Sequence, residues 1–387
     1  MTRPARLGVP LGKARAALRM TVRDFLTPDA RMADELACVV SVMLAIALAW
    51  RLGAGMVGWA AFTAFILMKG DVAETVLRGV LRLIGTAIGA GLALVVLPLA
   101  ARSLPVAMVA AAAIGAMGLY GMLTQKRAYA WFISGITFEM ILLDALTHPA
   151  FDTWQVARTR LIEVAAGTAA CVFVSITARA IARREWRKPS ARPVPVRWHP
   201  QAARHAAQAG IALAVLPAIA RYWNVEVLPQ VAVTIMAVMI VPVAGLPSGG
   251  LVPVSRRLLH RAMGCMAGGL LSLAFVLLAR GDPAIILLGT AIGIMIGRHI
   301  ENGPTQRAYI GLQFTLAVLV TLLPDNLSEA EITPALMRLA GILFGMAMLE
   351  PILLAWHWLV PSPVPPAAAV SHPGNKPPVE GRPDHGE

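Results

Sequence analysis

Residues 75–94 read TVLRGVLRLIGTAIGAGLAL, and residues 254–273 read VSRRLLHRAMGCMAGGLLSL. Both stretches contain the pattern Arg-x3-Arg-x2-Gly-x3-Gly within an apolar run. At about 100° per residue, these four positions fall within about 60° of one another around a helix. Each stretch therefore predicts a helix on which two guanidinium groups and two glycines share one face. The positions are Arg78, Arg82, Gly85 and Gly89 in the first copy and Arg257, Arg261, Gly264 and Gly268 in the second.

The glycines and the arginines of this pattern suggest different roles. Two glycines four residues apart form a small-residue groove that lets membrane helices approach closely, so we predict a structural role for all four glycines. Each arginine alone suits either of two roles, anchoring at lipid headgroups or binding an anion. For Arg82 and Arg261, the duplicated placement favours the second role.

The composition places the whole chain in a membrane. Of 387 residues, 57% are hydrophobic and only 14% are charged, more apolar surface than a soluble domain can bury. The net charge of +13 does not indicate a nucleic-acid partner, because the basic residues lie between apolar runs. Cys38, Cys171 and Cys265 each lie in an apolar run, without the spacing of a metal site or a disulfide framework.

The apolar runs predict an all-α polytopic membrane protein with about twelve transmembrane helices. The predicted spans are 36–50, 56–69, 79–99, 105–123, 128–146, 158–179, 206–220, 230–246, 258–279, 284–297, 308–323 and 335–360. The second and eighth are short for a bilayer core of about 30 Å. The predicted regions are a basic cytoplasmic tail (1–32), a first six-helix half (33–182), a basic Pro-rich linker (183–203), a second half (204–360) and a disordered tail (361–387).

The two halves repeat one another beyond the opening pattern. Lys126–Tyr129 reads KRAY, and Gln306–Tyr309 reads QRAY at the same place of the second half. Arg160 and Arg338 also correspond, and we predict a structural role for both. Because six spans bring the chain back to the side from which it started, the repeats are predicted to be parallel, related by an axis along the membrane normal.

The distribution of basic residues predicts the orientation. With the N-terminus inside, only seven of the 34 Lys and Arg residues fall in outer loops, and the other 27 are cytoplasmic. The positive-inside rule therefore favours a multi-pass protein of the bacterial inner membrane with both termini in the cytoplasm. The seven are Arg51, Arg102, Arg158, Arg160, Arg221, Arg280 and Arg338.

Two sets of polar residues are candidates for a transport site. Near the cytoplasmic helix ends, we expect arginines to bind substrate carboxylates and tyrosines to stack on the substrate or donate a hydrogen bond; these are Arg82, Arg261, Arg127, Arg307, Tyr129 and Tyr309. Carboxylates inside the membrane are costly, so Glu139, Glu163 and Glu350 are candidates for proton coupling, with structural pairing as the alternative. Glu163 lies within reach of a salt bridge to Arg160.

No motif indicates enzymatic chemistry. The chain lacks a phosphate-binding Gly-x4-Gly-Lys-Ser/Thr motif, a His-Glu-x2-His motif and a nucleophile elbow. We therefore predict no enzymatic activity, no cofactor and no metal, and transport that uses an ion gradient or the substrate's own gradient.

Three segments carry a resemblance to a known family. WAAFTAFIL (Trp59–Leu67), LRLIGTAIGAGLAL (Leu81–Leu94) and ARTRLIEVAAGTAACVF (Ala157–Phe173) resemble the fusaric acid resistance protein family. The resemblance is best over residues 33–180, and the second half, with VAVTIMAVMIVP (Val231–Pro242), is similar more loosely. Bacterial aromatic acid exporters are members of this family, and plant aluminium-activated malate transporters look related. Larger members have a cytoplasmic domain between the halves, where this chain has only a short linker.

The resemblance implies an inner-membrane efflux component for aromatic or other organic acids, together with a periplasmic membrane-fusion adaptor protein as partner. The intramembrane carboxylates favour a proton-coupled carrier. A passive organic-anion channel and a non-transport membrane scaffold are the alternatives. The expected partners are the lipid bilayer and a small organic anion, and the sequence does not determine whether the chain forms a homo-oligomer.

Overall fold

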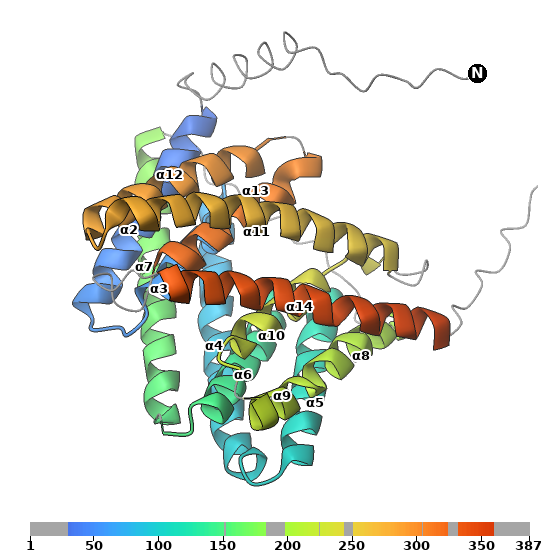
Figure 1. Ribbon diagram of the computed structural model, residues 1–387. Helices are drawn as coiled ribbons and strands as arrows, with labels where there is room; N and C mark the ends of the chain where they lie inside the picture. The colour runs from blue at the N-terminus through green and yellow to red at the C-terminus, as the bar shows by residue number, and fades with distance from the viewer. Residues whose placement is uncertain are drawn as a thin grey trace, which may run out of the picture.

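The computed structural model describes residues 30–150, 152–182, 198–223, 225–243, 251–303, 305–323 and 332–359, and the regular structure within them is entirely helical (Figure 1). The first half contains α2 (Ala30–Arg51), α3 (Val57–Leu67), α4 (Val72–Ala100), α5 (Leu104–Thr124), α6 (Ala128–Thr147) and α7 (Thr153–Ala182). The second contains α8 (Pro200–Ala214), α9 (Leu216–Trp223), α10 (Leu228–Val238), α11 (Leu251–Ala279), α12 (Pro283–Glu301), α13 (Thr305–Leu322) and α14 (Ile332–Leu359).

The prediction of an all-α, multi-pass membrane protein is confirmed, whereas the number of twelve spans is not. Within the described ranges, nine helical segments are long and apolar enough to cross a membrane, with α8 and α9 together forming one of them. The helices α3, α10 and α13 are shorter. The 11 residues of α3 rise only about 17 Å, roughly half of a bilayer core of about 30 Å.

The predicted basic tail up to residue 29, the linker at 183–197 and the tail from residue 360 lie outside the described residues. The helix α8 starts at Pro200, within the segment 183–203 that was predicted as the linker. Proline suits the first turn of a helix, where its missing N–H costs no hydrogen bond.

Two helices, α4 and α12, begin at aspartates whose side chains cap their first turn. Asp71 caps α4, and its Oδ1 accepts hydrogen bonds from the backbone N–H groups of Ala73 at 2.7 Å and Glu74 at 3.2 Å. Asp282 caps α12 in the same way through Ala284 N–H at 2.9 Å. Side-chain acceptors of this kind satisfy N–H groups that the first turn of a helix leaves unpaired.

The helices pack in corresponding pairs in the two halves. In the first half α4 and α5 pack on α6, and α7 contacts α2, α3 and α4. In the second half α11 and α12 pack on α13, and α14 contacts α10, α11 and α8. Between the halves α5 contacts α8 and α6 contacts α10, while α2 contacts α12 and α3 contacts α13.

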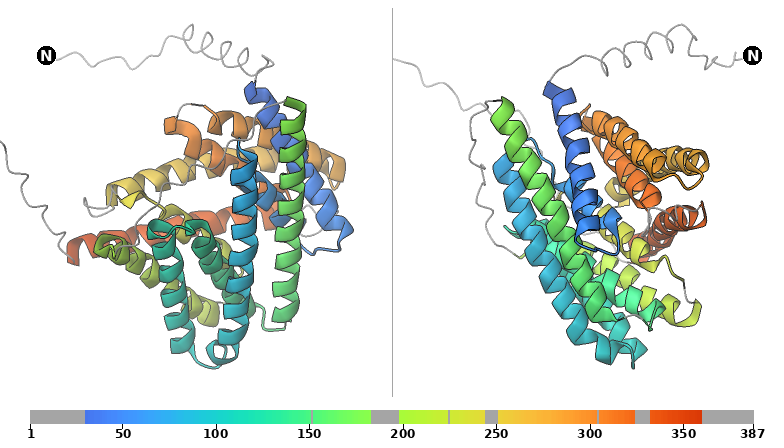
Figure 2. Two further views of the ribbon diagram at one scale, coloured as in Figure 1. Left: turned by 180° about the vertical axis from the view of Figure 1, so that it is seen from behind. Right: turned by 90° about the vertical axis from the view of Figure 1, so that its left-hand side faces the viewer.

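The long helices of one half run across those of the other. In Figure 1, α4, α5 and α7 extend vertically, while α11 and α14 extend horizontally. The right-hand view of Figure 2 shows α14 foreshortened, whereas α4 and α7 are seen along their length. The two sets of helices therefore tilt differently relative to any one membrane normal. The expected repeat about an axis along that normal stays a prediction.

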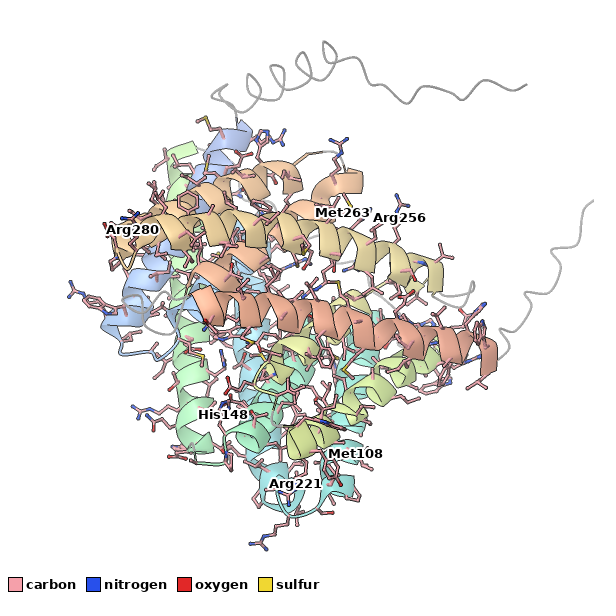
Figure 3. All side chains as sticks on the ribbon, viewed as in Figure 1. Met108, His148, Arg221, Arg256, Met263 and Arg280 are labelled. Atoms are coloured by element: carbon pink, nitrogen blue, oxygen red, sulfur yellow. The ribbon has the colours of Figure 1, made fainter. Side chains whose placement is uncertain are left out.

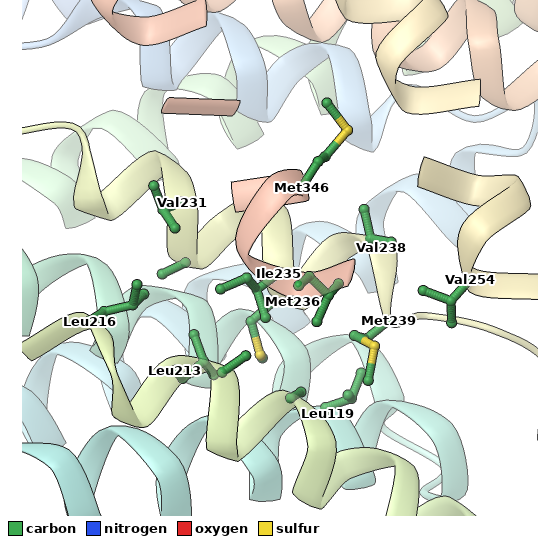
Figure 4. Packing of buried hydrophobic residues seen from close by; sticks show 14 of the residues in the cluster. Leu119, Leu213, Leu216, Val231, Ile235, Met236, Val238, Met239, Val254 and Met346 are labelled. Carbon is green, nitrogen blue, oxygen red and sulfur yellow. The ribbon is translucent and has the colours of Figure 1, made fainter. Parts of the chain in front are cut away.

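An apolar core joins the halves. Its fully buried members include Leu119 of α5, Leu213 of α8 and Met236 of α10 (Figure 4). Val254 of α11 and Met346 of α14 belong to the same cluster. Side chains from both halves interdigitate here, so the two halves pack as one unit.

Candidate functional site

The glycines of the repeated pattern lie where the arginine-bearing helices touch their neighbours. A Cβ on Gly85 would lie 2.6 Å from the backbone oxygen of Ala130, and one on Gly89 would lie 2.4 Å from that of Ser134. Only glycine therefore permits this approach of α4 to α6. The second half has the same contacts between α11 and α13, at 2.6 Å from Gly264 to Ile310 O and 2.4 Å from Gly268 to Phe314 O.

This close packing places the second arginine of each pattern next to uncharged hydrogen-bond partners. Arg82 is 6% exposed; its Nε donates to Thr63 Oγ1 at 3.2 Å and its Nη1 to the Tyr129 hydroxyl at 2.8 Å. Tyr129 accepts this bond, so its own hydroxyl proton is available to a ligand.

Arg261 has a corresponding environment in the second half. It is 5% exposed and donates through Nη2 to Thr234 Oγ1 at 3.1 Å and through Nη1 to Gln313 Oε1 at 2.5 Å. Neither Arg82 nor Arg261 forms an ion pair with a carboxylate of the described residues. Both positive charges are thus held in place by uncharged groups.

The first arginine of each pattern lies over a tyrosine ring. The guanidinium carbon of Arg78 is 5.9 Å from the centre of the Tyr129 ring, and that of Arg257 is 4.1 Å from the centre of the Tyr309 ring. Such contacts are favourable because the ring face is electron-rich. Arg257 and Tyr309 line the same cavity as Arg82 and Arg261, whereas Arg78 pairs with Glu74 at a partly exposed position.

That cavity, which we call the central cavity, has a volume of about 220 Å³ and lies between α3, α4 and α6 of one half and α10, α11 and α13 of the other. Three arginines line it, and no Asp or Glu lies among its lining residues, all of which the structure describes. The first half contributes an aromatic wall, and the second half contributes amides and aliphatic side chains. The aromatic wall consists of Trp59, Phe62, Tyr129 and Phe132.

Several hydrogen-bonding atoms of the central cavity have no partner among the described residues. They include the Tyr309 hydroxyl, Nε of Arg257 and Nε of Arg261. Buried polar groups are almost always satisfied, so unsatisfied donors at a cavity indicate a site for a polar ligand. All three are donors suited to a carboxylate.

The structure brings together two of the four arginines that were predicted to bind substrate. Arg82 and Arg261 meet at the central cavity, as do Tyr129 and Tyr309, but Arg127 and Arg307 are exposed and do not line it. On α13, Arg307 lies two residues before Tyr309, and residues two apart point to nearly opposite sides of a helix, whereas Arg127 precedes the first residue of α6. Arg257 was not among the expected binding residues, although it is part of the repeated pattern. Its neighbour Arg256 points away from the bundle (Figure 3).

A second cavity of about 390 Å³ adjoins the central one. It is lined by Arg160 and Arg338, which correspond in the two halves, and by the ionisable residues Asp144, His148 and Glu226. His148, labelled in Figure 3, lies 3.5 Å from Asp144 at the end of α6. Arg338 donates to the backbone oxygens of Val320 at 3.1 Å and Leu323 at 3.2 Å. Arg160 and Arg338 therefore line the second cavity and also form contacts within the helix packing.

The three candidate carboxylates have different environments. Glu163 accepts from Arg160 Nη1 at 3.2 Å and from the backbone N–H of Met56 at 3.0 Å, which is the expected ion pair with an added bond to the start of α3. Glu350 accepts from the Ser255 hydroxyl at 3.0 Å, joining α14 to α11.

Glu139 is completely buried, and neither of its carboxylate oxygens has a hydrogen-bond partner among the described residues. It lies against Gly115 of α5, where a Cβ would meet its Oε1 at 3.0 Å and Leu213 of α8 at 2.2 Å. It lines neither the central nor the second cavity. Glu139 therefore lies where α5, α6 and α8 meet.

An ion cluster joins α2 to α12, and no sequence motif predicts it. Arg298 is 5% exposed and contacts Asp34 and Glu301, each at 3.0 Å, and His299 contacts Glu35 at 3.0 Å. Arg298 also donates to the backbone oxygen of Met68 at 3.2 Å. In the adjoining turn between α3 and α4, burial lowers the pKa of the Lys69 amine. The cluster ties the two halves together, but its partners are 264 residues apart, so no local pattern indicates it.

Among the described residues, no group of three or more His, Cys, Asp or Glu side chains could hold a metal ion. The three cysteines are buried and unpaired, Cys265 at the central cavity and Cys38 and Cys171 in the packing of α2 and α7.

Comparisons with known proteins agree with this architecture. Residues 44–174, which run from α2 to α7, match the family model described as fusaric acid resistance protein-like. Neither the curated proteins nor the solved structures include a match to the chain. The resemblance seen in the sequence is thus confirmed for residues 44–174, which are similar to the fusaric acid resistance protein-like family.

Proposed function

We propose that this membrane protein exports organic anions with an apolar or aromatic body, and that the central cavity binds their carboxylate. The family model that residues 44–174 match and the nine apolar helical segments of the described residues support a multi-pass membrane transporter. The observation that carries the proposal is the lining of the central cavity, three arginines without a carboxylate beside an aromatic wall.

Electrostatics support an anionic ligand. Burying a guanidinium group without a counter-charge is costly. Arg82 and Arg261 are both nearly inaccessible, and their hydrogen-bond partners among the described residues are neutral. A bound carboxylate would supply the missing negative charge and accept several charge-assisted hydrogen bonds. The unsatisfied Tyr309 hydroxyl adds a neutral donor.

The shape of the cavity favours a small acid. Its volume of about 220 Å³ is below the 300–1,000 Å³ that is usual for drug-sized ligands, so a single-ring acid is the expected size. Trp59, Phe62 and Phe132 would contact the apolar body of the ligand. Guanidinium donors for a carboxylate, next to aromatic rings for an apolar body, favour aromatic carboxylates over inorganic anions.

We further propose that the chain consists of two six-helix halves related by an approximate two-fold axis through the central cavity. The corresponding contacts support this: α4 on α6 matches α11 on α13, and α5 on α8 matches α12 on α2. The distribution of basic residues supports an inner-membrane location with both termini in the cytoplasm. In that orientation Arg82 and Arg261 lie toward the cytoplasm, and Arg160 and Arg338 lie toward the outside.

Proton coupling, with Glu139 as the carrier of the proton, is proposed on the burial of this carboxylate without a partner among the described residues. A passive organic-anion channel is the second candidate, because paired arginines line both cavities in succession. Transport against a substrate gradient would distinguish the carrier from the channel. A periplasmic membrane-fusion adaptor protein and a homo-oligomer are proposed partners that rest on the family resemblance.

The proposal is tested by removing one guanidinium at a time. Arg82→Gln and Arg261→Gln should each remove charge-assisted hydrogen bonds worth about 1.5–3 kcal/mol, which corresponds to roughly 10- to 150-fold weaker binding of benzoate. Binding to purified protein and benzoate flux in proteoliposomes are the measurements. Arg256→Gln, at an exposed position next to the cavity residue Arg257, is the matched control.

Benzoate binding that is equal in Arg82→Gln and Arg256→Gln would refute the assignment of the cavity. A loss of folded protein in Arg82→Gln and Arg261→Gln, without a specific transport defect in the fraction that folds, would assign these arginines to structure alone.

A further inference from the structure

The central and second cavities are neighbours in series. Trp59, Phe62, Gln230 and Val320 line both of them, so these four side chains form the wall between the two spaces. Trp59 and Phe62 are one helical turn apart on α3, and their ring centres are 5.4 Å apart. The wall therefore consists largely of one aromatic pair.

An arginine lies at each end of this aromatic pair. The guanidinium carbon of Arg82, in the central cavity, is 5.9 Å from the centre of the Phe62 ring. The guanidinium carbon of Arg160, in the second cavity, is 4.5 Å from the centre of the Trp59 ring. Arg160 is in turn held by Glu163 at 3.2 Å, and Glu163 is itself bonded to the backbone of Met56 next to α3.

The second half lacks this arrangement. Gln230 and Val233 of α10 stand where α3 has Trp59 and Phe62, judged by the matching contacts of Thr63 with Arg82 and of Thr234 with Arg261. Arg338, the counterpart of Arg160, bonds to the backbone oxygens of Val320 and Leu323. The aromatic partition is thus a feature of one half alone, although both halves contribute arginines to both cavities.

We propose that Trp59 and Phe62 are a movable partition through which the organic anion passes from the central to the second cavity, with Arg160 as the residue that holds Trp59 closed. The inference rests on the proposed transport of organic anions. A carboxylate that leaves Arg82 meets Arg160 next, and its charge competes with Glu163 for that guanidinium. Once Arg160 turns toward the anion, Trp59 loses the cation stacked on its face.

The charges that line the two cavities agree with passage of the anion from the central to the second cavity. The central cavity has three arginines and no carboxylate among its lining residues, whereas Asp144 and Glu226 join two arginines in the second cavity. An anion is therefore held more weakly in the second cavity, because the resident carboxylates compete with it for the arginines. The second cavity is thereby suited to release and the central cavity to capture.

Cys265 provides a reporter that does not depend on transport. It lines the central cavity, and Cys38→Ala combined with Cys171→Ala leaves it as the single thiol of the chain. The probe is the membrane-impermeant anion sulfonatoethyl methanethiosulfonate, applied to sealed vesicles from one side at a time. In this background, Trp59→Ala should raise the rate of Cys265 labelling from the side of the second cavity at least tenfold.

Arg160→Gln, which keeps the Trp59 ring but removes its stacked cation, should raise the same rate by a smaller factor of about three. Trp154→Ala, at a tryptophan on α7 that is 65% exposed, is the matched control and should leave the rate unchanged. Labelling at the parent rate in both Trp59→Ala and Arg160→Gln overturns the partition. If Trp59→Ala does not fold, the Arg160→Gln rate decides alone.

The outcome is distinguishable from a failure of the proposed function. Faster labelling in Trp59→Ala with unchanged benzoate binding in Arg82→Gln would leave the partition standing and reject the central cavity as the binding site. Weaker benzoate binding in Arg82→Gln with unchanged labelling in Trp59→Ala would reject the partition alone.

Discussion

The groove between α4 and α6 allows a sharp test of the packing that positions Arg82. In Gly89→Ala, the new Cβ would lie 2.4 Å from the backbone oxygen of Ser134, 2.9 Å from Thr137 Cβ and 3.1 Å from Phe138 N. Ordinary contact requires at least about 3.4 Å, so α4 must move away from α6 by roughly 1 Å. Two of the three opposing atoms are backbone atoms of a helix, which cannot move aside by a change of rotamer.

Gly91 provides the matched control on the same helix. No atom lies within 4 Å of a Cβ built at Gly91, so Gly91→Ala gains only the better helix propensity of alanine, about 1 kcal/mol. Gly89→Ala has the same gain together with the cost of overpacking, about 1–3 kcal/mol. The difference between the two variants therefore isolates the contact with α6, and Gly89→Ala should be less stable than Gly91→Ala by about 1–3 kcal/mol.

The three buried cysteines permit a thermal assay in which a thiol-reactive dye reports unfolding in detergent. Domains of 150–250 residues change in Tm by roughly 2–4 °C per kcal/mol, so we expect Gly89→Ala to melt several degrees below Gly91→Ala. Gly268→Ala, whose Cβ would lie 2.4 Å from the backbone oxygen of Phe314, should behave like Gly89→Ala. Equal Tm values for Gly89→Ala and Gly91→Ala would refute the close approach of α4 and α6.

Three further predictions concern coupling, the contact between the halves and the orientation. Glu139→Gln should abolish uphill transport in proteoliposomes with a proton gradient but leave downhill exchange intact, and uphill transport by the variant would exclude Glu139 as the coupling group. Arg298→Ala should lower the free energy of unfolding by about 3–5 kcal/mol, because it leaves Asp34 and Glu301 without their buried partner. Arg78→Ala, which breaks a half-exposed pair with Glu74, should cost at most about 1 kcal/mol, and equal losses in the two variants would contradict the burial of the cluster. Reporter fusions after Arg102 and Arg280 should read as outside, and an inside reading at either would overturn the proposed repeat.

Local sequence determined the helices and their closest contacts. Apolar runs and helical periodicity are properties of neighbouring residues, and they predicted the all-α membrane fold and the shared face of Arg82, Gly85 and Gly89. The similarity of residues 44–174 to the fusaric acid resistance protein-like family was also readable from contiguous segments. The duplication of the arginine pattern singled out Arg82 and Arg261, both of which line the central cavity. The pairing of Arg160 with Glu163 followed from a spacing of three residues on one helix.

Only the tertiary structure decided which way each helix faces and what lies opposite. It separated Arg127, which is exposed, from Tyr129, which lines the central cavity, and it added Arg257 to that cavity. It also distinguished the paired Glu163 from Glu139. The physical reason is that the rotation of a helix about its axis depends on contacts with segments far away in the sequence, such as the 264 residues between Asp34 and Arg298. The wall between the two cavities is such a feature, because Trp59 lies between them only through its position relative to the surrounding helices.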